Sequence, residues 1–195
     1  MKNIKKKKII INKKNLGAGY SRNIGIRNSK GKFIAFIDAD DIWNRNKLQN
    51  QLEFMLKKNS SFSFTSYKII GEKNNELKRI NARNKITYKN LINSCDIGLS
   101  TVMLEKRIMK NNKFPNLKTK EDYVLWLKLS RSVEMNGLNN FLTSWRITNN
   151  SLSSSNLQKI KDAFLVYNKY LKFNIIKSIF LVLNLSANFF KKRYL

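Results

Sequence analysis

The sequence predicts an α/β domain in which helices cover both faces of a doubly wound sheet. Short apolar runs alternate along the chain with longer stretches whose apolar residues recur every three or four positions. The run at residues 33–37 (FIAFI) is too short and too continuously apolar for a surface helix, which is typical of a central parallel strand. Ligands of such sheets bind at the carboxyl ends of strands. Asp38, Asp40 and Asp41 follow this run directly.

The first expected elements precede those aspartates. Residues 9–12 (IIIN) predict a short buried strand. After a turn ending at Gly17, Tyr20 and Ile24 lie four positions apart, as on one face of a helix that stops near Gly31. The order is therefore strand, helix, strand.

The alternation continues after the aspartates. Apolar residues of a second predicted helix trace one face: Leu48, Leu52, Met55 and Leu56. Residues 61–70 (SFSFTSYKII) and 98–105 (GLSTVMLE) predict strands. A helix is expected after Glu121, a final strand through residues 141–147 and a further helical pattern over residues 157–171. We expect a catalytic domain at residues 1–150 and a helical segment at residues 151–195.

The end of the chain has a distinct character. Polar residues such as Lys177 and Asn184 interrupt the apolar run of residues 174–195, and KKR closes it. A spanning helix needs about 20 apolar residues, so the run predicts a helix lying at a membrane surface. The alternative is a helix that packs on the domain while its lysines are solvated.

Composition limits the chemistry. The 195 residues include 39 Lys and Arg against 12 Asp and Glu, a formal charge of +27, which favours phosphate-rich partners; compositional drift is the alternative. Without histidine, catalysis must use carboxylates. Cys95 is the only cysteine, so no intrachain disulfide can form, and we expect it to be a small core residue in a reducing compartment. The basic start lacks a secretory signal, so we expect no export.

The D-A-D-D segment is the candidate metal site. At a strand end, Asp38 and Asp40 would lie on the same side of an extended chain and could share one Mg²⁺ or Mn²⁺ that bridges a diphosphate. The alternative is that Asp40 or Asp41 caps a helix beginning near Trp43.

Residues 15–55 resemble the family 2 glycosyltransferases, which have the GT-A fold. The family pattern is close to N-x-G-x-x-x-A-R-N-x-G-I, then A-x-G-x-x-I-A-F-L-D-x-D-D, then K-L-x-x-Q. The matching positions are Asn15, Gly17, Arg22, Asn23, Gly25, Ile26, Gly31, Asp38, Asp40, Asp41, Lys47, Leu48 and Gln51. Ser21 stands where the family usually has alanine. The resemblance implies that Asp40 holds the metal, with Asp38 near the ribose, Asp41 as support and Arg22 adding positive charge.

Two later segments extend the resemblance. TKEDYVLWLKLSR (119–131) is similar to the family's E-D-Y-x-L-W-L segment, which implies that Asp122 is the catalytic base of an inverting enzyme. Without that context, Glu121 and Asp122 would be read as acids favoured at a helix N-terminus. WRITNNSLSSSN (145–156) is similar to the Y-R-x-x-x-N-S-L-S-S segment of polysaccharide-assembly members, and Arg146 could meet the diphosphate or brace the loop.

The resemblance implies transfer of a sugar from a nucleotide-diphosphate donor to a glycan or lipid-linked acceptor in cell-surface polysaccharide biosynthesis. It starts in the middle of the family's domain, without strand and helix units of about 60 residues. We therefore expect a partial donor pocket and no transfer by this chain alone. The alternatives are a basic protein that binds nucleic acid or anionic membranes, or an inactive remnant. For the enzyme we expect peripheral contact with the inner membrane face and no nucleic-acid partner.

Overall fold

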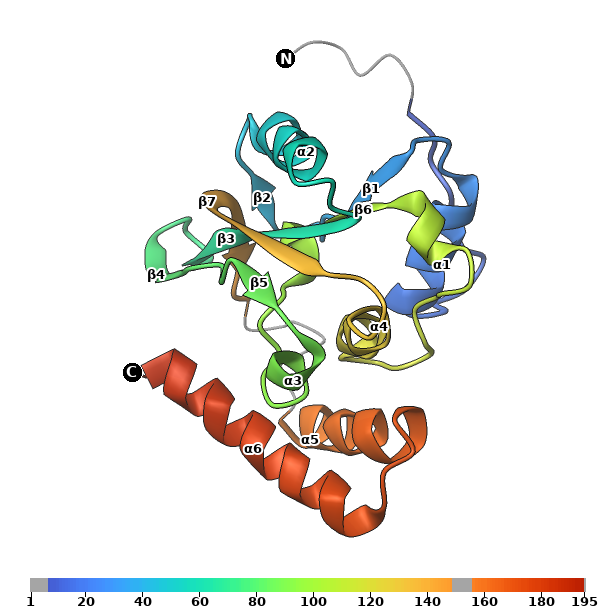
Figure 1. Ribbon diagram of the computed structural model, residues 1–195, viewed down its shortest axis with the longest axis vertical. Helices are drawn as coiled ribbons and strands as arrows, with labels where there is room; N and C mark the ends of the chain where they lie inside the picture. Colours follow the sequence, from blue (N-terminus) through green and yellow to red (C-terminus); the bar gives the residue numbers. More distant parts are fainter. Residues whose placement is uncertain (1–6, 149–155, 195) are drawn as a thin grey trace.

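A mixed sheet organises the part of the chain that this computed structural model describes, residues 7–148 and 156–194. The strand order is β1-β6-β3-β7-β2, with β4 paired to β3 and β5 paired to β7 (Figure 1). Of these pairs, β3 with β7 is parallel and the others are antiparallel. The strands are β1 (Phe33–Ala35), β2 (Ile42–Trp43), β3 (Phe62–Ile70), β4 (Glu76–Ile80), β5 (Lys85–Ile86), β6 (Met103–Glu105) and β7 (Met135–Arg146).

Helices lie on both faces of the sheet, which confirms the predicted α/β class. Figure 1 shows α2 on one face and α4 on the other, with α5 and α6 beyond α4. The α-helices are α1 (Ala18–Asn28), α2 (Lys47–Lys57), α3 (Tyr88–Leu91), α4 (Glu121–Leu129), α5 (Asn156–Leu165) and α6 (Ile175–Tyr194). Shorter helical turns are η1 (Leu99–Thr101), η2 (Lys106–Met109) and the π-helical η3 (Val166–Tyr170).

Most predicted elements are confirmed, with shifted boundaries. The expected strand at residues 98–105 divides into the η1 turn and β6. The final strand, expected from residue 141, already begins at Met135 as β7. The helical pattern over residues 157–171 corresponds to α5 and η3. The expected domain boundary near residue 150 lies outside the described residues.

Two expectations about strands are wrong. Residues 9–12 form no strand, and Ile9 and Ile11 are 76% and 86% exposed. In the described part of the chain no strand pairs with this run, so the run is not built into the sheet. The strand predicted at residues 33–37 forms as β1, but it lies at one end of the strand order and runs antiparallel to β6. An apolar run fixes burial but does not fix the direction of the neighbouring strand.

The buried face of α2 is partly polar, which corrects the expected apolar face in part: Met55 is buried as expected and Leu52 is half-buried. Leu48 and Leu56 are exposed, whereas Lys47 and Gln51 are fully buried. The Lys47 ammonium donates to Gln51 Oε1 at 2.7 Å and lies 4.4 Å from the centre of the Trp43 ring. Gln51 in turn donates to Ser63 Oγ at 3.0 Å and to the carbonyl of Thr101 at 2.9 Å. A satisfied polar network can occupy a core position that periodicity assigns to leucine.

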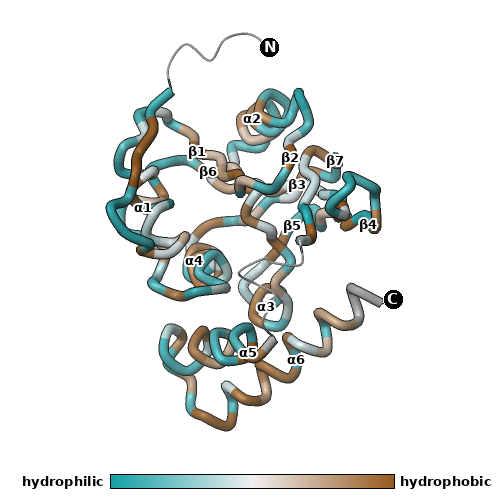
Figure 2. The backbone as a smooth tube through the Cα atoms, turned by 180° about the vertical axis from the view of Figure 1, so that it is seen from behind, coloured by the Kyte–Doolittle hydropathy of each residue, from teal (hydrophilic) through white to brown (hydrophobic). Residues whose placement is uncertain are grey.

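The C-terminal helices share the main hydrophobic core. Buried residues of α5, η3 and α6 belong to the same cluster as α4: Ala163, Val166, Tyr167, Leu181, Val182 and Leu185. Apolar colouring nevertheless continues along much of α6 in Figure 2. Among the described residues, no helix has the length and apolar character needed to cross a bilayer. Cys95 is exposed, contrary to the expectation of a core residue, because it lies in the irregular segment between α3 and η1.

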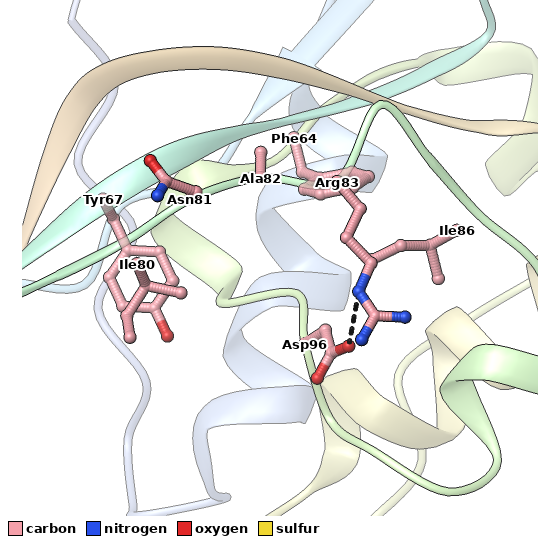
Figure 3. A pocket seen from close by; sticks show the side chains of 8 residues that line it. All are labelled: Phe64, Tyr67, Ile80, Asn81, Ala82, Arg83, Ile86 and Asp96. Carbon is pink, nitrogen blue, oxygen red and sulfur yellow. Dashed lines mark ion pairs between the residues drawn. The ribbon is translucent and has the colours of Figure 1, made fainter. Parts of the chain in front are cut away.

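A small cavity of about 70 Å³ opens beside β3. Figure 3 shows Arg83 reaching towards Asp96, to which it is ion-paired at 4.0 Å. The lining residues are Phe64, Tyr67, Ile80, Asn81, Ala82, Arg83, Ile86 and Asp96. None of the predicted site residues lines this cavity.

Candidate active site

The three aspartates lie on the connection that leads from β1 to β2, two strands at opposite ends of the strand order. The amide of Asp41 donates to the carbonyl of Asp38 at 3.1 Å, so residues 38–41 form a β-turn. Asp38 and Asp40 therefore project from a turn, and the expected extended geometry is wrong. The capping alternative is also wrong, because β2 follows the turn and the N-cap of α2 is Asn46.

Ser100 fixes this turn from the neighbouring η1 segment. Its hydroxyl accepts from the Asp38 amide at 3.0 Å, and its carbonyl accepts from Trp43 Nε1 at 2.8 Å. Ser100 is buried. Sequence reasoning missed it, because no local pattern marks a serine whose partners lie about 60 positions away.

Asp41 supports the turn from inside. Its Oδ1 accepts from the backbone amide of Arg146 at 2.9 Å, and the side chain is 9% exposed. Burial raises the pKa of Asp41 to about 6, while hydrogen bonds from Ser100 and Arg146 act in the opposite direction. This environment suits a residue that holds the backbone in place better than one that binds a cation directly.

Arg146 braces the turn against a second loop. Its Nε donates to the carbonyl of Asp40 at 2.9 Å, and its Nη1 donates to the carbonyl of Gly71 at 3.1 Å. Its Nη2 donates to Asn74 Oδ1 at 2.7 Å. Of the two predicted roles of Arg146, bracing the loop matches these bonds, since its guanidinium makes four hydrogen bonds to the turn and the loop at residues 71–74.

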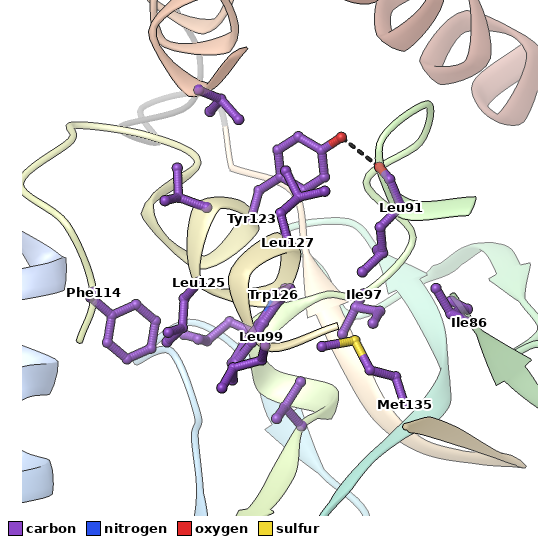
Figure 4. Packing of buried hydrophobic residues seen from close by; sticks show 14 of the residues in the cluster. Ile86, Leu91, Ile97, Leu99, Phe114, Tyr123, Leu125, Trp126, Leu127 and Met135 are labelled. Atoms are coloured by element: carbon purple, nitrogen blue, oxygen red, sulfur yellow. Dashed lines mark hydrogen bonds between the residues drawn. The ribbon is translucent and has the colours of Figure 1, made fainter. Parts of the chain in front are cut away.

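Asp122 lies in the first turn of α4, where the helix is held rigidly. Figure 4 shows Tyr123, Leu125, Trp126 and Leu127 of α4 packed into the hydrophobic core, and the Trp126 ring lies 6.0 Å from the ring of Phe114. Tyr123 and Trp126 are fully buried, and the Tyr123 hydroxyl donates to the carbonyl of Leu91 at 2.5 Å. The predicted position of Glu121 and Asp122 at a helix N-terminus is confirmed.

Arg22 connects the aspartate turn to the start of α4. Its Nη2 donates to Asp38 Oδ1 at 2.7 Å, and its Nη1 forms an ion pair with Glu121. Burial opposes the charged form, but the carboxylates of Asp38 and Glu121 raise the pKa of Arg22 above its usual value. Glu121 was read from sequence only as a helix-start acid; its role as the second partner of Arg22 depends on the tertiary fold.

The helix that carries Arg22 is docked closely. Asn23 of α1 exchanges two hydrogen bonds with the backbone of Phe114, at 2.8 and 2.9 Å. A Cβ on Gly19 would lie 2.7 Å from the carbonyl oxygen of Pro115, so only glycine permits this approach. Gly19 and Asn23, which lie on the same helix as Arg22, therefore set the position of its guanidinium.

The electrostatics of Asp122 suit a general base. Burial is the largest cause, followed by the negative charge of Glu121, and together they raise the pKa of Asp122 to about 6. The charge of Arg22 and the hydrogen bond from the Tyr123 amide partly offset this rise. A base whose pKa lies just below neutral is ionised at pH 7 and still accepts a proton effectively.

Asp162 of α5 clamps the segment that leads into α4. Its Oδ2 accepts from the amide and the hydroxyl of Thr119, at 2.9 and 2.8 Å. The next residue, Lys120, has a left-handed backbone with φ of 62°, and its side chain makes no cap hydrogen bond. The hydrogen bonds between Thr119 and Asp162 therefore tie the strained segment that precedes Asp122 to α5.

The donor set of the turn fits a hard divalent cation. Asp38 and Asp40 offer carboxylate oxygens, and the side chain of Asp40 is exposed. Mg²⁺ typically uses one or two carboxylates, several waters and substrate phosphates, so two carboxylates suffice when a diphosphate is also present. Within residues 7–148 and 156–194 there is no cluster of three or more His, Cys, Asp or Glu that could hold a metal without such a substrate.

The mixed sheet with helices on both faces, and an aspartate turn bridged through Arg22 to the start of α4, match the GT-A class of glycosyltransferase folds. The sequence pattern described as "Glycosyl transferase family 2" matches residues 1–117. The chain belongs to this family, and the resemblance drawn from its motifs is confirmed.

Curated relatives extend along most of the chain. It is 36% identical over 179 residues to the UDP-Glc:alpha-D-GlcNAc-diphosphoundecaprenol beta-1,3-glucosyltransferase WfgD of Escherichia coli, covering 91% of this chain and 70% of WfgD. It is 32% identical over 187 residues to TuaG of Bacillus subtilis (strain 168), a glycosyltransferase provisionally assigned to teichuronic acid biosynthesis, covering 95% of this chain and 74% of TuaG.

A solved structure shares the fold. Residues 1–349 of S. aureus TarS, crystallised with UDP-GlcNAc, superpose with a TM-score of 0.62 at 18% identity. The match covers 86% of this chain, which spans 51% of the TarS chain. The comparison supports the GT-A architecture.

Proposed function

We propose that this protein transfers a sugar from a nucleotide-diphosphate donor to a glycan or lipid-linked acceptor in the synthesis of a cell-surface polysaccharide. The observation that carries the proposal is the bridge made by Arg22, which holds the aspartate turn and the start of α4 together. Donor-side carboxylates and a base-side carboxylate are thereby assembled in one site. The names of WfgD and TuaG support the same class of substrate.

In the proposed reaction, Asp122 accepts the proton of the acceptor hydroxyl as that oxygen attacks the anomeric carbon. The bond between the anomeric carbon and the nucleotide diphosphate breaks on the opposite side, which inverts the centre. Asp41 and Arg146 hold the turn, and Arg22 orients Asp38 and keeps positive charge beside it. Each of these residues works by positioning charge before the reaction begins.

Asp40 and Asp38 would hold Mg²⁺ or Mn²⁺. When bound, the cation would stabilise the negative charge of the leaving diphosphate. We assign the exposed carboxylate of Asp40 as the principal ligand. Asp38 already accepts from Arg22, so we assign it a shared role between the cation and the ribose.

We further propose that the protein works as a peripheral protein at the inner face of the membrane. Acceptors linked to diphosphoundecaprenol, such as the one in the name of WfgD, are held in a bilayer. Peripheral contact would bring such an acceptor to the site.

The test is sugar transfer with Mn²⁺, a panel of UDP-sugars and GlcNAc-diphosphoundecaprenol. It uses two forms of the protein: this chain, and this chain preceded by the corresponding N-terminal segment of WfgD. Transfer by the extended form alone would support the proposed function and also the expectation that this chain alone is inactive. Transfer by both forms would support the function and remove that expectation. Asp122→Asn should abolish transfer, whereas Glu53→Gln, on the exposed side of α2, should leave it unchanged. Failure of both forms with every donor would overturn the proposed function.

A further inference from the structure

The outward side of α6 is apolar, although α6 is already packed on the core. Four residues face the rest of the molecule and are buried: Ser178, Leu181, Val182 and Leu185. On the other side of the helix, five large apolar residues are 49–81% exposed: Ile175, Ile176, Ile179, Phe180 and Leu183. We call these five residues the outer face of α6. Figure 2 shows α6 at the margin of the molecule, with α5 on its inner side.

The spacing of the outer face is that of one helical surface. Positions 175, 179 and 183 recur every four residues, and positions 176 and 180 form a second row beside them. Lys177 and Asn184 lie on a strip of α6 beside the outer face, and none of the five outer-face positions is polar. A helix that is apolar on two sides is normally covered on both. Within the described residues, only the inner side of α6 is covered.

The charge around α6 indicates what covers its outer face. Residues 156–195 contain one acidic residue, Asp162, which is buried against Thr119. The same segment carries eight basic residues: Lys159, Lys161, Lys169, Lys172, Lys177, Lys191, Lys192 and Arg193. Apolar anchors together with basic residues match the boundary between anionic headgroups and acyl chains. A second copy of the chain would bring its own formal charge of +27 against the first, which opposes self-association.

We propose that the outer face of α6 inserts into the surface of a bilayer containing anionic lipid, with the helix axis parallel to the membrane. The 20 residues of α6 give the helix a length of about 30 Å, enough to seat all five side chains in one plane. This inference deepens the peripheral membrane contact proposed above and rests on it. It assigns that contact to one helical surface and gives it a lipid preference.

The test is co-sedimentation of the full chain with vesicles of phosphatidylcholine alone, or of phosphatidylcholine and phosphatidylglycerol at about 7:3. The expected result is binding to the anionic vesicles that weakens as salt is added, because screening removes the electrostatic part of the attraction. The variant Ile176→Gln/Phe180→Gln keeps the net charge and should weaken binding at least about tenfold, since two anchors are lost.

A matched control separates the outer face from apolar exposure in general. Ile9→Gln/Ile11→Gln removes two isoleucines that are highly exposed but lie outside α6, and this variant should bind as the unchanged protein does. Both variants change only exposed side chains, so circular dichroism and the melting temperature should stay the same. Equal vesicle binding by the α6 variant and the unchanged protein would overturn the proposal, as would no binding by the unchanged protein.

Two further results distinguish this inference from others. Self-association that disappears in Ile176→Gln/Phe180→Gln would assign the outer face to a second copy of the chain and overturn lipid docking. Vesicle binding through α6 in a protein that transfers no sugar would keep the docking surface while removing the proposed transferase function.

Discussion

Arg22 and Glu121 form an ion pair across 99 positions of sequence, and the same guanidinium binds Asp38. The side chains of Arg22 and Glu121 are 18% and 9% exposed, so each charge depends on the other for compensation. The pair is what brings a carboxylate-bearing turn and a helix start into a single site.

Replacing Arg22 should therefore lower the free energy of unfolding by more than the loss of a surface ion pair does. We expect Arg22→Met to lower the free energy of unfolding by about 3 kcal/mol, because it leaves the Glu121 carboxylate buried without its partner. Arg22→Lys should rescue only part of this loss, since an ammonium cannot hold two carboxylates with the fork of a guanidinium. Urea unfolding monitored by tryptophan fluorescence measures both effects. If Glu121→Gln did not reduce the cost of Arg22→Met, the two residues would not be coupled.

The raised pKa of Asp122 predicts the acid side of the pH–rate profile. A general base must be ionised, so kcat should rise through a pH of about 6 and level off above it. Asp122→Asn should lower kcat at least about a hundredfold and leave the KM for donor nearly unchanged. The measurement is transfer between pH 4.5 and 8 by the form preceded by the N-terminal segment of WfgD. Glu53→Gln serves as the control and should show the same profile as the unchanged protein; a flat profile in that pH range would remove Asp122 from the role of base.

Asp40 should be needed for the cation and dispensable for folding. Asp40→Asn should weaken Mn²⁺ binding in the presence of UDP about tenfold or more, because it removes one of two carboxylate ligands. The melting temperature should change little, since the side chain of Asp40 is exposed. Titration calorimetry measures the affinity, with Glu134→Gln, an exposed acid remote in sequence, as the control. Unchanged affinity in Asp40→Asn would show that the turn does not bind the cation through this residue.

Lys47 should make stability depend on pH above neutrality. Burial lowers the pKa of Lys47 to about 7, below its ordinary value of 10.5. Between these values the unfolded chain binds more protons than the folded protein, so the free energy of unfolding rises with pH, by at most about 1.4 kcal/mol per pH unit. Lys47→Met should reduce this slope between pH 7 and 9. Parallel slopes in the two proteins, measured by urea unfolding, would show that Lys47 stays charged in the fold.

The sequence was sufficient for the elements and the motif residues but not for their pairing. The carboxylates of the turn, Arg22 and Asp122 are local signals, because the chemistry demands those side chains and short motifs carry them. The apolar run at residues 33–37 identified β1. Its antiparallel partner, however, is β6, which lies about 70 positions later in the sequence. Direction and neighbours of a strand are tertiary properties.

The residues that sequence reasoning missed act through distant partners. Ser100 holds the aspartate turn but does not stand out in its own segment. Glu121 belongs to the E-D-Y segment, but its pairing with Arg22 depends on the tertiary fold. The buried face of α2 shows the same limit. Helical periodicity placed Met55 correctly in the core, but it also assigned Leu48 and Leu56 there and overlooked the polar residues Lys47 and Gln51. Their burial depends on hydrogen bonds that only the assembled sheet provides.

The clamp of Thr119 by Asp162 also has a consequence for the order of synthesis. Thr119 leaves the ribosome 43 residues before Asp162, so the approach to α4 is made well before the carboxylate that holds it. At about 5–20 residues per second, this interval lasts several seconds. During that time the nascent chain has its aspartate turn and Arg22 but cannot fix the segment that leads to Asp122. The segment that leads to Asp122 can therefore be fixed only after α5, which carries Asp162, has been translated.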